Sequence, residues 1–94
     1  MEDLLTSKLR IKDDVLIQEL GGEAVFLNLE SEEYFGTDDI GTDMLMTLKE
    51  MLSIQEAYDR LLEKYDVEPE QLKQDLLDFI EKLIQHGLVK ITDS

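Results

Sequence analysis

The thiol and imidazole side chains that most often serve as nucleophile and general base are scarce in this chain. Cysteine is absent, His86 is the only histidine, and no serine stands in a G-x-S-x-G sequence. His86 precedes Gly87 near the expected end of a helix, where a cation is favoured electrostatically, so a capping or surface role explains it well. With one histidine and no thiol, a nucleophile–base pair is hard to assemble. The sequence therefore predicts no catalytic residues and a protein that is not an enzyme.

Metal and cofactor chemistry has equally little support. Without cysteine the chain has neither disulfides nor thiolate ligands. Asp38, Asp39 and Asp43 lie close in sequence, but their spacing differs from that of a calcium-binding loop and no bidentate Glu follows. Acidic residues are favoured at a helix N-terminus, which is a simpler explanation for them. We predict no metal site and no cofactor.

One short segment resembles the phosphopantetheine attachment motif G-x-D-S-[LM] of acyl carrier proteins. Residues 41–45 have the same frame, but Met44 occupies the position of the modified serine. A thioether has no hydroxyl to carry the arm, so a carrier function is excluded.

The net charge restricts the partners. Nine basic and 23 acidic residues give a formal net charge of −14. Nucleic-acid binding needs Lys and Arg to neutralise phosphates, so we expect no nucleic-acid partner. The electrostatic field of this negative charge can instead steer a basic peptide or protein toward the chain, although a role in solubility alone also explains the charge.

Length and composition predict one small domain. The 94 residues are 43% hydrophobic and 34% charged, which suits a folded chain with a modest core. No apolar run approaches ~20 residues and the N-terminus has no signal-peptide pattern, so we expect no membrane partner and a cytoplasmic location. We expect a flexible tail over residues 1–7, a single domain over 8–91 and a second tail over 92–94.

Turn residues divide the first third of the chain into strands. Val15–Leu20 and Ala24–Leu29 are separated by Gly21-Gly22, which supply the positive φ angles of a two-residue hairpin turn. Tyr34–Gly36 is a short third strand, and Lys8–Lys12 is either a strand or an extended lead-in. In a simple meander the third strand lies at an edge. An unpaired edge is a liability unless a partner completes it.

The rest of the chain has helical period, and its capping residues place the helix ends. Thr42 or Asp43 begins a helix over 43–51, and a capping box opening at Ser53 begins a second one that breaks at Asp66. Pro69 begins a third helix that runs to about residue 86, with Gly87 as its left-handed stop and an extended ending over 88–91. We predict an α+β fold: a three-stranded antiparallel sheet followed by a three-helix bundle, similar to a winged helix-turn-helix.

Two alternative functions follow from this arrangement. Winged helices often bind DNA, but the helix over Glu68–His86 has only Lys73 and Lys82 against five acidic residues, which is the wrong sign of charge. A structural subunit that self-associates through the open edge is the second alternative.

An extended peptide can also complete an open edge, with main-chain hydrogen bonds for affinity and side-chain pockets for selectivity. At ~0.5–1.5 kcal/mol per net hydrogen bond, four or five bonds are insufficient, so apolar anchors are needed. The third helix has a central apolar stripe, and Lys73, Leu77 and Ile84 lie on one flank of it, given ~100° per residue. We predict a groove between the third strand and this flank. The predicted peptide-binding residues are Glu32, Glu33, Tyr34, Phe35, Gly36, Lys73, Leu76, Leu77, Ile80 and Ile84. We expect proline at Phe35 to abolish binding by removing an edge amide.

The order and spacing of several segments resemble the PqqD family. The resemblance covers about residues 8–91 and departs from the family pattern at Thr37-Asp38 and Met44-Leu45, where Leu-Asn and Ile-Trp are usual. The segments are Val25–Leu29, Tyr34-Phe35, Asp38-x-x-Gly41-x-x-Met44, Ser53–Glu56, Tyr65-Asp66 and His86–Val89.

The resemblance implies a protein that recognises the leader peptide of a ribosomally made precursor. In the family, the leader adds as a fourth strand to the third strand and docks side chains toward the third helix. Here that implies backbone pairing over Glu32–Gly36, apolar contacts from Tyr34, Phe35, Leu77 and Ile84, and contact of Lys73 with an acidic leader residue. A free-standing acidic chain is similar to the recognition proteins of lasso-peptide pathways, which implies a cysteine-protease-type leader peptidase as maturation partner. A peptide chaperone in pyrroloquinoline quinone biosynthesis is the alternative within the family.

Overall fold

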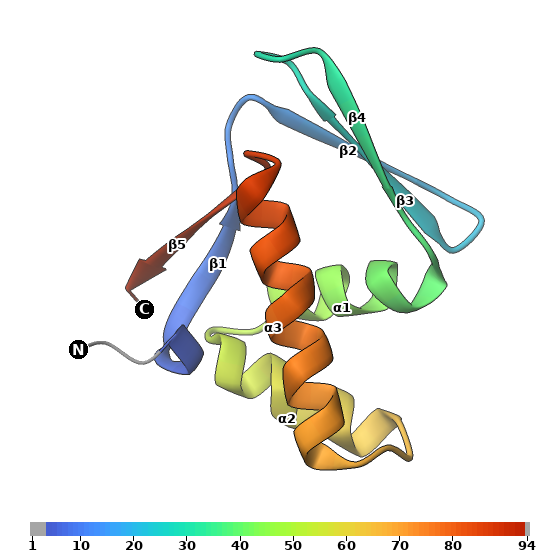
Figure 1. The fold of residues 1–94 in the computed structure, drawn as a ribbon, viewed down its shortest axis with the longest axis vertical. Helices are drawn as coiled ribbons and strands as arrows, with labels where there is room; N and C mark the ends of the chain where they lie inside the picture. Colours follow the sequence, from blue (N-terminus) through green and yellow to red (C-terminus); the bar gives the residue numbers. More distant parts are fainter. Residues whose placement is uncertain (1–3, 94) are drawn as a thin grey trace.

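The computed structural model describes residues 4–93, and Figure 1 shows how they are arranged. A turn of 3₁₀ helix over Leu4–Thr6 comes first. The other elements, in chain order, are β1 (Ser7–Ile11), β2 (Val15–Leu20), β3 (Glu23–Asn28), β4 (Glu33–Thr37), α1 (Asp39–Glu50), α2 (Ile54–Lys64), α3 (Pro69–Gln85) and β5 (Val89–Asp93). The predicted α+β class, with an antiparallel sheet and three helices, is confirmed.

The strands form two separate sheets. β2, β3 and β4 make an antiparallel meander with β3 in the middle. β1 pairs antiparallel with β5, so that Ser7 lies opposite Asp93 and Ile11 opposite Val89. In Figure 1 this two-stranded ribbon lies on one side of α3 and the three-stranded sheet on the other. The sequence predicted an extended segment at each end of the domain but not that the two segments pair with each other.

Pairing between β1 and β5 also corrects the predicted tails. Ser7, assigned to the N-terminal tail, begins β1, and the preceding residues 4–6 are helical. Thr92, assigned to the C-terminal tail, lies opposite Lys8 in β5. Residues 1–3 and Ser94 of the predicted tails lie outside the described residues.

The hairpin turn between β2 and β3 is as predicted. Gly21 and Gly22 have φ angles of 60° and 86°, and Leu20 lies opposite Glu23. Two successive positive φ angles define a type I′ turn, whose twist matches that of the strands it joins. The turn fixes the register and therefore which side chains of the sheet face the helices.

The first helix begins earlier than predicted. Its N-cap is Asp38, whose Oδ1 accepts a hydrogen bond from the Gly41 backbone N–H at 2.8 Å, whereas Thr42 and Asp43 lie inside the helix. Gly41 is buried, and a Cβ there would lie 3.1 Å from the Thr37 Cβ and 3.4 Å from the Phe79 ring. Glycine at this position therefore lets α1 start directly after β4 and against α3.

The other helix boundaries follow the predicted caps. The Ser53 hydroxyl accepts from the Glu56 backbone N–H at 3.2 Å and opens α2. Pro69 lies in the first turn of α3, and Gly87, with a φ angle of 70°, follows the helix end. None of the described helices is long and apolar enough to cross a membrane.

The core lies between the inner face of the three-stranded sheet, the ribbon and the helices. Each strand contributes alternate residues to it, and each helix contributes one face. Its fully buried large side chains are Leu9, Phe26, Leu45, Leu48, Ile54, Leu61, Leu76, Ile80, Leu83 and Leu88.

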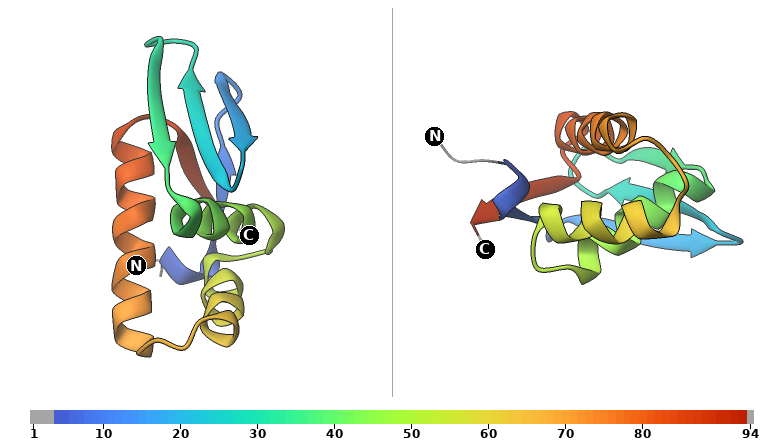
Figure 2. Two further views of the ribbon diagram at one scale, coloured as in Figure 1. Left: turned by 90° about the vertical axis from the view of Figure 1, so that its right-hand side faces the viewer. Right: turned by 90° about the horizontal axis from the view of Figure 1, so that it is seen from below.

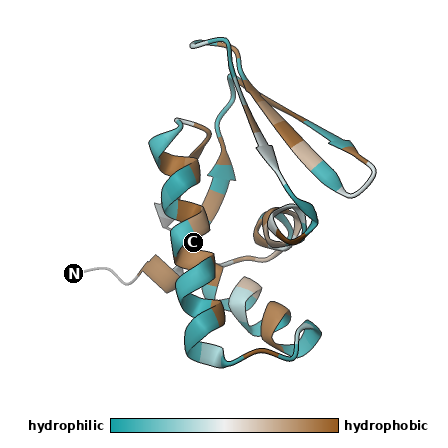
Figure 3. Cartoon of the chain, turned by 45° about the vertical axis from the view of Figure 1, so that its right-hand side comes forward, coloured by the Kyte–Doolittle hydropathy of each residue, from teal (hydrophilic) through white to brown (hydrophobic). Residues whose placement is uncertain are grey.

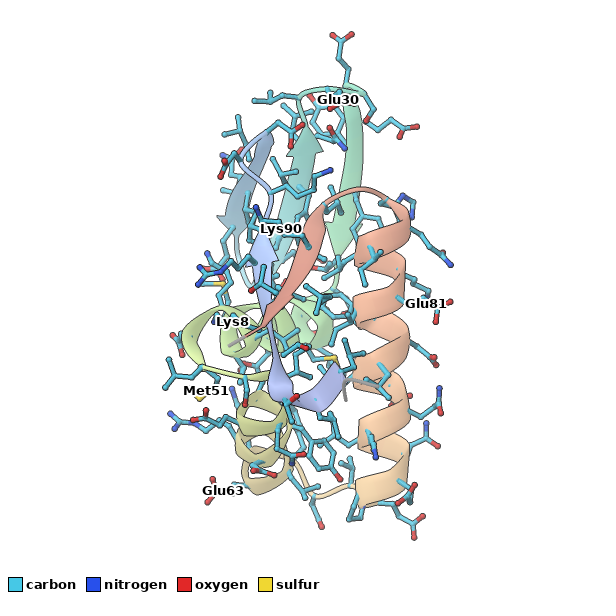
Figure 4. All side chains as sticks on the ribbon, turned by 90° about the vertical axis from the view of Figure 1, so that its left-hand side faces the viewer. Lys8, Glu30, Met51, Glu63, Glu81 and Lys90 are labelled. Carbon is cyan, nitrogen blue, oxygen red and sulfur yellow. The ribbon has the colours of Figure 1, made fainter. Side chains whose placement is uncertain are left out.

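A lysine from the ribbon closes the C-terminal end of α1. The Lys8 Nζ donates to the backbone oxygens of Leu48 at 3.1 Å, Lys49 at 2.9 Å and Met51 (Figure 4). The last carbonyls of a helix have no partner within the helix and carry a partial negative charge, so a cation stabilises them. β1 is thereby fastened to α1 as well as to β5.

Candidate functional site

The open edge of the sheet is the outer side of β4. β4 pairs with β3 on one side, and no other strand of residues 4–93 pairs with it. Figure 2 shows β4 between β3 and the C-terminal half of α3. The prediction that the third strand of the meander lies at an edge is confirmed, and the edge faces the third helix.

Two residues of β4 direct their backbone groups to this edge. The Leu29 N–H donates to the Asp14 oxygen at 2.8 Å, so the backbone groups of Leu29 face β2. Because backbone groups of successive strand residues face alternate neighbours, those of Phe26 face β4, where Phe35 lies opposite. The residues of β4 whose N–H and C=O groups face the open edge are therefore Tyr34 and Gly36.

This geometry corrects the proposed proline test. The Phe35 amide faces β3, so proline at Phe35 would break the sheet rather than the pairing with a guest strand. Proline at Gly36 removes an amide that faces outward.

The side chains of Tyr34 and Phe35 lie on opposite faces of the sheet. Tyr34 is 73% exposed on the face turned away from the helices. The Phe35 ring is half-buried on the inner face, packs edge-on against Phe26 at 5.9 Å between centroids, and lies 4.6 Å from the His86 ring. Phe35, but not Tyr34, therefore lines the space between β4 and α3.

Asn28 fixes the distance between the β3–β4 hairpin and α3. Its Oδ1 accepts from the backbone N–H groups of Glu30 at 3.0 Å and Ser31 at 3.3 Å, which shapes the turn. Its Nδ2 donates to the backbone oxygens of His86 and Gly87, each at 3.4 Å. One buried amide side chain therefore holds the start of β4 against the end of α3.

The flank of α3 that faces β4 differs from the predicted one. Phe79 approaches the start of α1 beside β4, and His86 contacts Phe35. At ~100° per residue, Leu77 and Ile84 lie roughly 160° around the helix from these two residues. The structure therefore does not bring Leu77 and Ile84 next to β4.

The other predicted residues lie on the far flank of α3, in the core, or where β4 begins. Lys73 lies on the flank of Leu77 and Ile84, away from β4. Leu76 and Ile80 are 1% and 0% exposed, because they occupy the middle of the buried face of α3, so they belong to the core and offer no contact surface. Glu32 and Glu33 are exposed where β4 begins, and Glu32 has a φ angle of 61° in the turn.

Sequence reasoning missed the residues of α3 that do face β4. The predicted roles hold, since Phe79 packs against the core and His86 is the exposed C-cap of α3, but both residues also lie beside the open edge. Lys82 lies between them on the same flank, three residues after Phe79 and four before His86. Helical period identifies both flanks equally well, so only the packing of β4 selects one. We call Phe79, Lys82 and His86 the β4-facing flank.

One cluster of ionisable side chains links two helices and contains groups with shifted pKa values. The cluster lies away from the β4 edge. The Tyr65 hydroxyl donates to the Asp43 Oδ2, and the Lys64 Nζ lies 2.7 Å from the same oxygen. Burial raises the pKa of Asp43, but the bonds from Lys64 and Tyr65 outweigh it and leave the pKa below its usual value. The bond to Asp43, together with burial, raises the pKa of Tyr65 to about 12. This cluster joins α1 to the end of α2 and serves the fold.

Comparisons with known proteins show similarity in family and in fold. The family model for coenzyme PQQ synthesis protein D (PqqD) matches residues 23–89. Among solved structures, TbiB1 in complex with the TbiA(beta) leader peptide is 30% identical, with a TM-score of 0.81 over 86% of this chain and 94% of that one. A lasso peptide synthetase B1 complexed with the leader peptide is 19% identical, with a TM-score of 0.80 over 88% of this chain and 98% of that one. No curated protein sequence matches significantly.

Proposed function

The chain belongs to the PqqD family, and from this premise we propose that it binds the leader peptide of a ribosomally made precursor by strand addition to β4. The observation that carries the proposal is the open β4 edge, which faces α3 and has two residues with outward backbone groups. TbiB1, a similar protein, is solved with a leader peptide. The proposed class of precursor is a lasso peptide.

The register of β4 determines which leader side chains meet which surface. The leader pairs with the N–H and C=O groups of Tyr34 and Gly36. A leader residue opposite Phe35 directs its side chain into the space bounded by Phe79 and His86. That residue is apolar or aromatic, because two backbone pairs alone contribute only a few kcal/mol before ordering costs.

Lys82 replaces Lys73 as the proposed partner of an acidic leader residue. Lys82 is exposed on the β4-facing flank, whereas Lys73 is half-buried on the other flank. A carboxylate on the leader beside Lys82 gains from a charge-assisted bond that Lys73 is not placed to make.

The proposed role is recruitment rather than chemistry. The protein holds the leader and presents the precursor to a separate cysteine-protease-type leader peptidase, without catalysing a step itself. Strand addition suits this role because it orders the leader while the rest of the precursor stays free.

The family description favours a second candidate, a peptide chaperone in pyrroloquinoline quinone synthesis. Both candidates use the same edge and differ in the precursor that they bind. Titration with the two kinds of precursor peptide separates them.

The winged helix-turn-helix likeness of the helical part remains a proposal about architecture alone. α3, which would enter a DNA groove, has Lys73 and Lys82 against Glu70, Asp75, Asp78 and Glu81. This charge opposes contact with phosphates, so we do not propose DNA binding.

The test compares two substitutions at Gly36. Gly36→Pro removes the outward amide and adds a ring at the edge, and we expect leader affinity to fall roughly 100-fold, about 3 kcal/mol. Gly36→Ala is the matched control: a Cβ there has no atom within 4 Å, so we expect a change of about twofold or less. Calorimetric titration measures both variants, and urea unfolding checks that each is folded.

A leader N-methylated at one position at a time gives a second measurement that does not alter the protein. Strand pairing predicts that affinity falls at alternate positions only, since every second leader amide faces β4. Equal loss at consecutive positions, or a folded Gly36→Pro variant with unchanged affinity, would reject strand addition at β4.

A further inference from the structure

One core-facing position of β3 holds a polar side chain. Ala24, Phe26 and Asn28 alternate along the strand toward the helices and are 1%, 0% and 8% exposed. Figure 3 shows apolar segments recurring along the three-stranded sheet, whereas this row of buried side chains ends in an amide. A buried amide costs free energy unless it is hydrogen-bonded, and an aliphatic side chain of similar volume has no such requirement. The amide at this position therefore needs an explanation other than packing.

The Asn28 amide uses both of its ends. Its Oδ1 accepts from the backbone N–H groups of Glu30 and Ser31, within the turn that leads to β4. Its Nδ2 donates to the backbone oxygens of His86 and Gly87, at the end of α3. A side-chain amide has two acceptor positions and two donors, so this arrangement fills all four. Because the amide group is planar and rigid, it holds the turn and the helix end at one separation.

The end of α3 that Asn28 holds also carries a ring that faces β4. The His86 ring lies 4.6 Å from the Phe35 ring between centroids, with 43° between the two planes. Phe35 in turn packs edge-on against Phe26 of the core, at 5.9 Å between centroids. A movement of α3 away from β4 would break both the ring contact and the bonds from Asn28. The two interactions therefore oppose the same displacement.

Gly87 allows the close approach of Asn28 to the helix end. Its φ angle is 70°, which side chains rarely adopt, and a Cβ there would lie 3.4 Å from the Asn28 Nδ2. The glycine that ends α3 therefore also brings its carbonyl oxygen within reach of the amide. Strand and helix both contribute a residue type that suits this link.

We propose that Asn28 is a positioning residue that limits the size of the leader side chain accepted opposite Phe35. This proposal rests on the proposed function. The leader residue opposite Phe35 directs its side chain toward His86 and Phe79. With α3 held by Asn28, that side chain has to fit the existing space, because the helix cannot move outward to admit a larger one. Asn28 is buried beneath the edge and acts on the leader through His86.

Two substitutions remove the link to α3 and keep an acceptor for the turn. Asn28→Asp keeps the shape of the side chain but places an oxygen against the carbonyl groups of His86 and Gly87, at the negative end of the helix dipole. Asn28→Ser leaves an oxygen that can accept within the turn, ends short of α3 and buries no charge. The matched control is Ser31→Asp, because Ser31 is exposed in the same turn and the substitution adds the same charge as Asn28→Asp.

The probes are four leader peptides that carry Val, Leu, Phe or Trp at the position opposite Phe35. That position lies between the two leader positions at which N-methylation lowers affinity most. In calorimetric titration we expect the unmodified chain to bind the Trp leader at least about tenfold more weakly than the best of the four. We expect both Asn28 variants to reduce this ratio to about threefold or less, and Ser31→Asp to keep it. Nuclear Overhauser effects between the Phe35 and His86 rings should weaken in the Asn28 variants only.

A merely structural role for Asn28 predicts a different result. Loss of stability alone would weaken all four leaders by the same factor and leave the ratio unchanged, and urea unfolding shows which variants are folded. An unchanged ratio in a folded Asn28 variant would overturn the proposal. Equal affinity of the unmodified chain for all four leaders, or an equal fall of the ratio in Ser31→Asp, would overturn it as well. Failure of the unmodified chain to bind any leader is a separate result, because it rejects the proposed function itself.

Discussion

The two sheets of this protein each have open edges but differ in what surrounds them. The β1–β5 ribbon joins the two ends of the chain, buries Leu9 and Val89 in the core, and sends Lys8 to the end of α1. The β2–β3–β4 sheet has its inner face on the core but exposes Leu16, Leu20 and Tyr34 on its outer face. Its β4 edge lies next to α3, where the Phe35 ring contacts the His86 ring.

This difference indicates that the ribbon mainly stabilises the fold and the three-stranded sheet mainly serves binding. The ribbon uses its side chains to close the domain, and its residues have partners within the molecule. The three-stranded sheet has an open β4 edge beside α3 and also exposes apolar side chains on its outer face, and both features are liabilities unless partners cover them. Substitutions in the ribbon should therefore change stability, and substitutions on the open parts of the sheet should change binding.

The largest expected effect on stability is in the ribbon. Leu9→Ala removes a side chain that is 1% exposed, and we expect the free energy of unfolding to fall by ~2–4 kcal/mol. Leu16→Ala, at a 55% exposed position of β2, should change it by ~0.5 kcal/mol or less. Urea unfolding of both variants measures the contrast. Similar losses in the two variants would show that the sheet face is as important for folding as the ribbon.

A smaller effect is expected from the lysine that fastens the ribbon to α1. Lys8→Met keeps the length of the side chain but leaves three backbone oxygens without their cation, so unfolding free energy should fall by ~1–2 kcal/mol. Lys90→Met on β5, an exposed position, is the control and should change little. Leader affinity should stay the same in both. A leader affinity that depends on Lys8 would contradict the proposal that the ribbon affects stability and not binding.

The smallest expected effect comes from the contact between α1 and α2. The pKa of Tyr65 rises to about 12 on folding, above its ordinary value of 10.0. Its contribution is fully present below pH 10, where both states keep the proton, and is lost as pH rises toward 12, because the unfolded state releases the proton first. Tyr65→Phe should lower unfolding free energy by ~1 kcal/mol at neutral pH and flatten the decline between pH 10 and 12. Urea unfolding across this range measures the slope. An unchanged slope would contradict the role of the Tyr65–Asp43 bond.

The sequence predicted the parts of the fold that local chemistry determines. Gly21-Gly22, Ser53, Pro69 and Gly87 each act within a few residues, and each lies at the predicted turn or helix end. α1 was placed too late because Thr42 and Asp43 also suit a cap and Gly41 disfavours a helix interior. The glycine is needed for a tertiary contact with Thr37 and Phe79, which no local pattern reveals.

The sequence predicted the strand edge of the candidate site but not the flank of α3 that faces it. The β4 edge follows from the order of the strands, and the order follows from short turns. The choice of α3 flank depends on how Asn28 and Phe35 meet the end of the helix, which is a contact over more than 50 residues of sequence. Hydrophobic period gives two equivalent flanks and cannot choose between them. The pairing of β1 with β5 was missed for the same reason, since its partners lie at opposite ends of the chain.

The central claim is that a leader peptide completes the sheet at β4, and amide hydrogen exchange followed by NMR tests it most directly. In the free protein the amides of Tyr34 and Gly36 face the open edge and should exchange quickly, whereas the Phe35 amide faces β3 and should exchange slowly. Addition of leader should slow exchange at Tyr34 and Gly36 and leave Phe35 unchanged. Protection that appears instead along β2 or β5, with Tyr34 and Gly36 still exchanging quickly, would contradict the account.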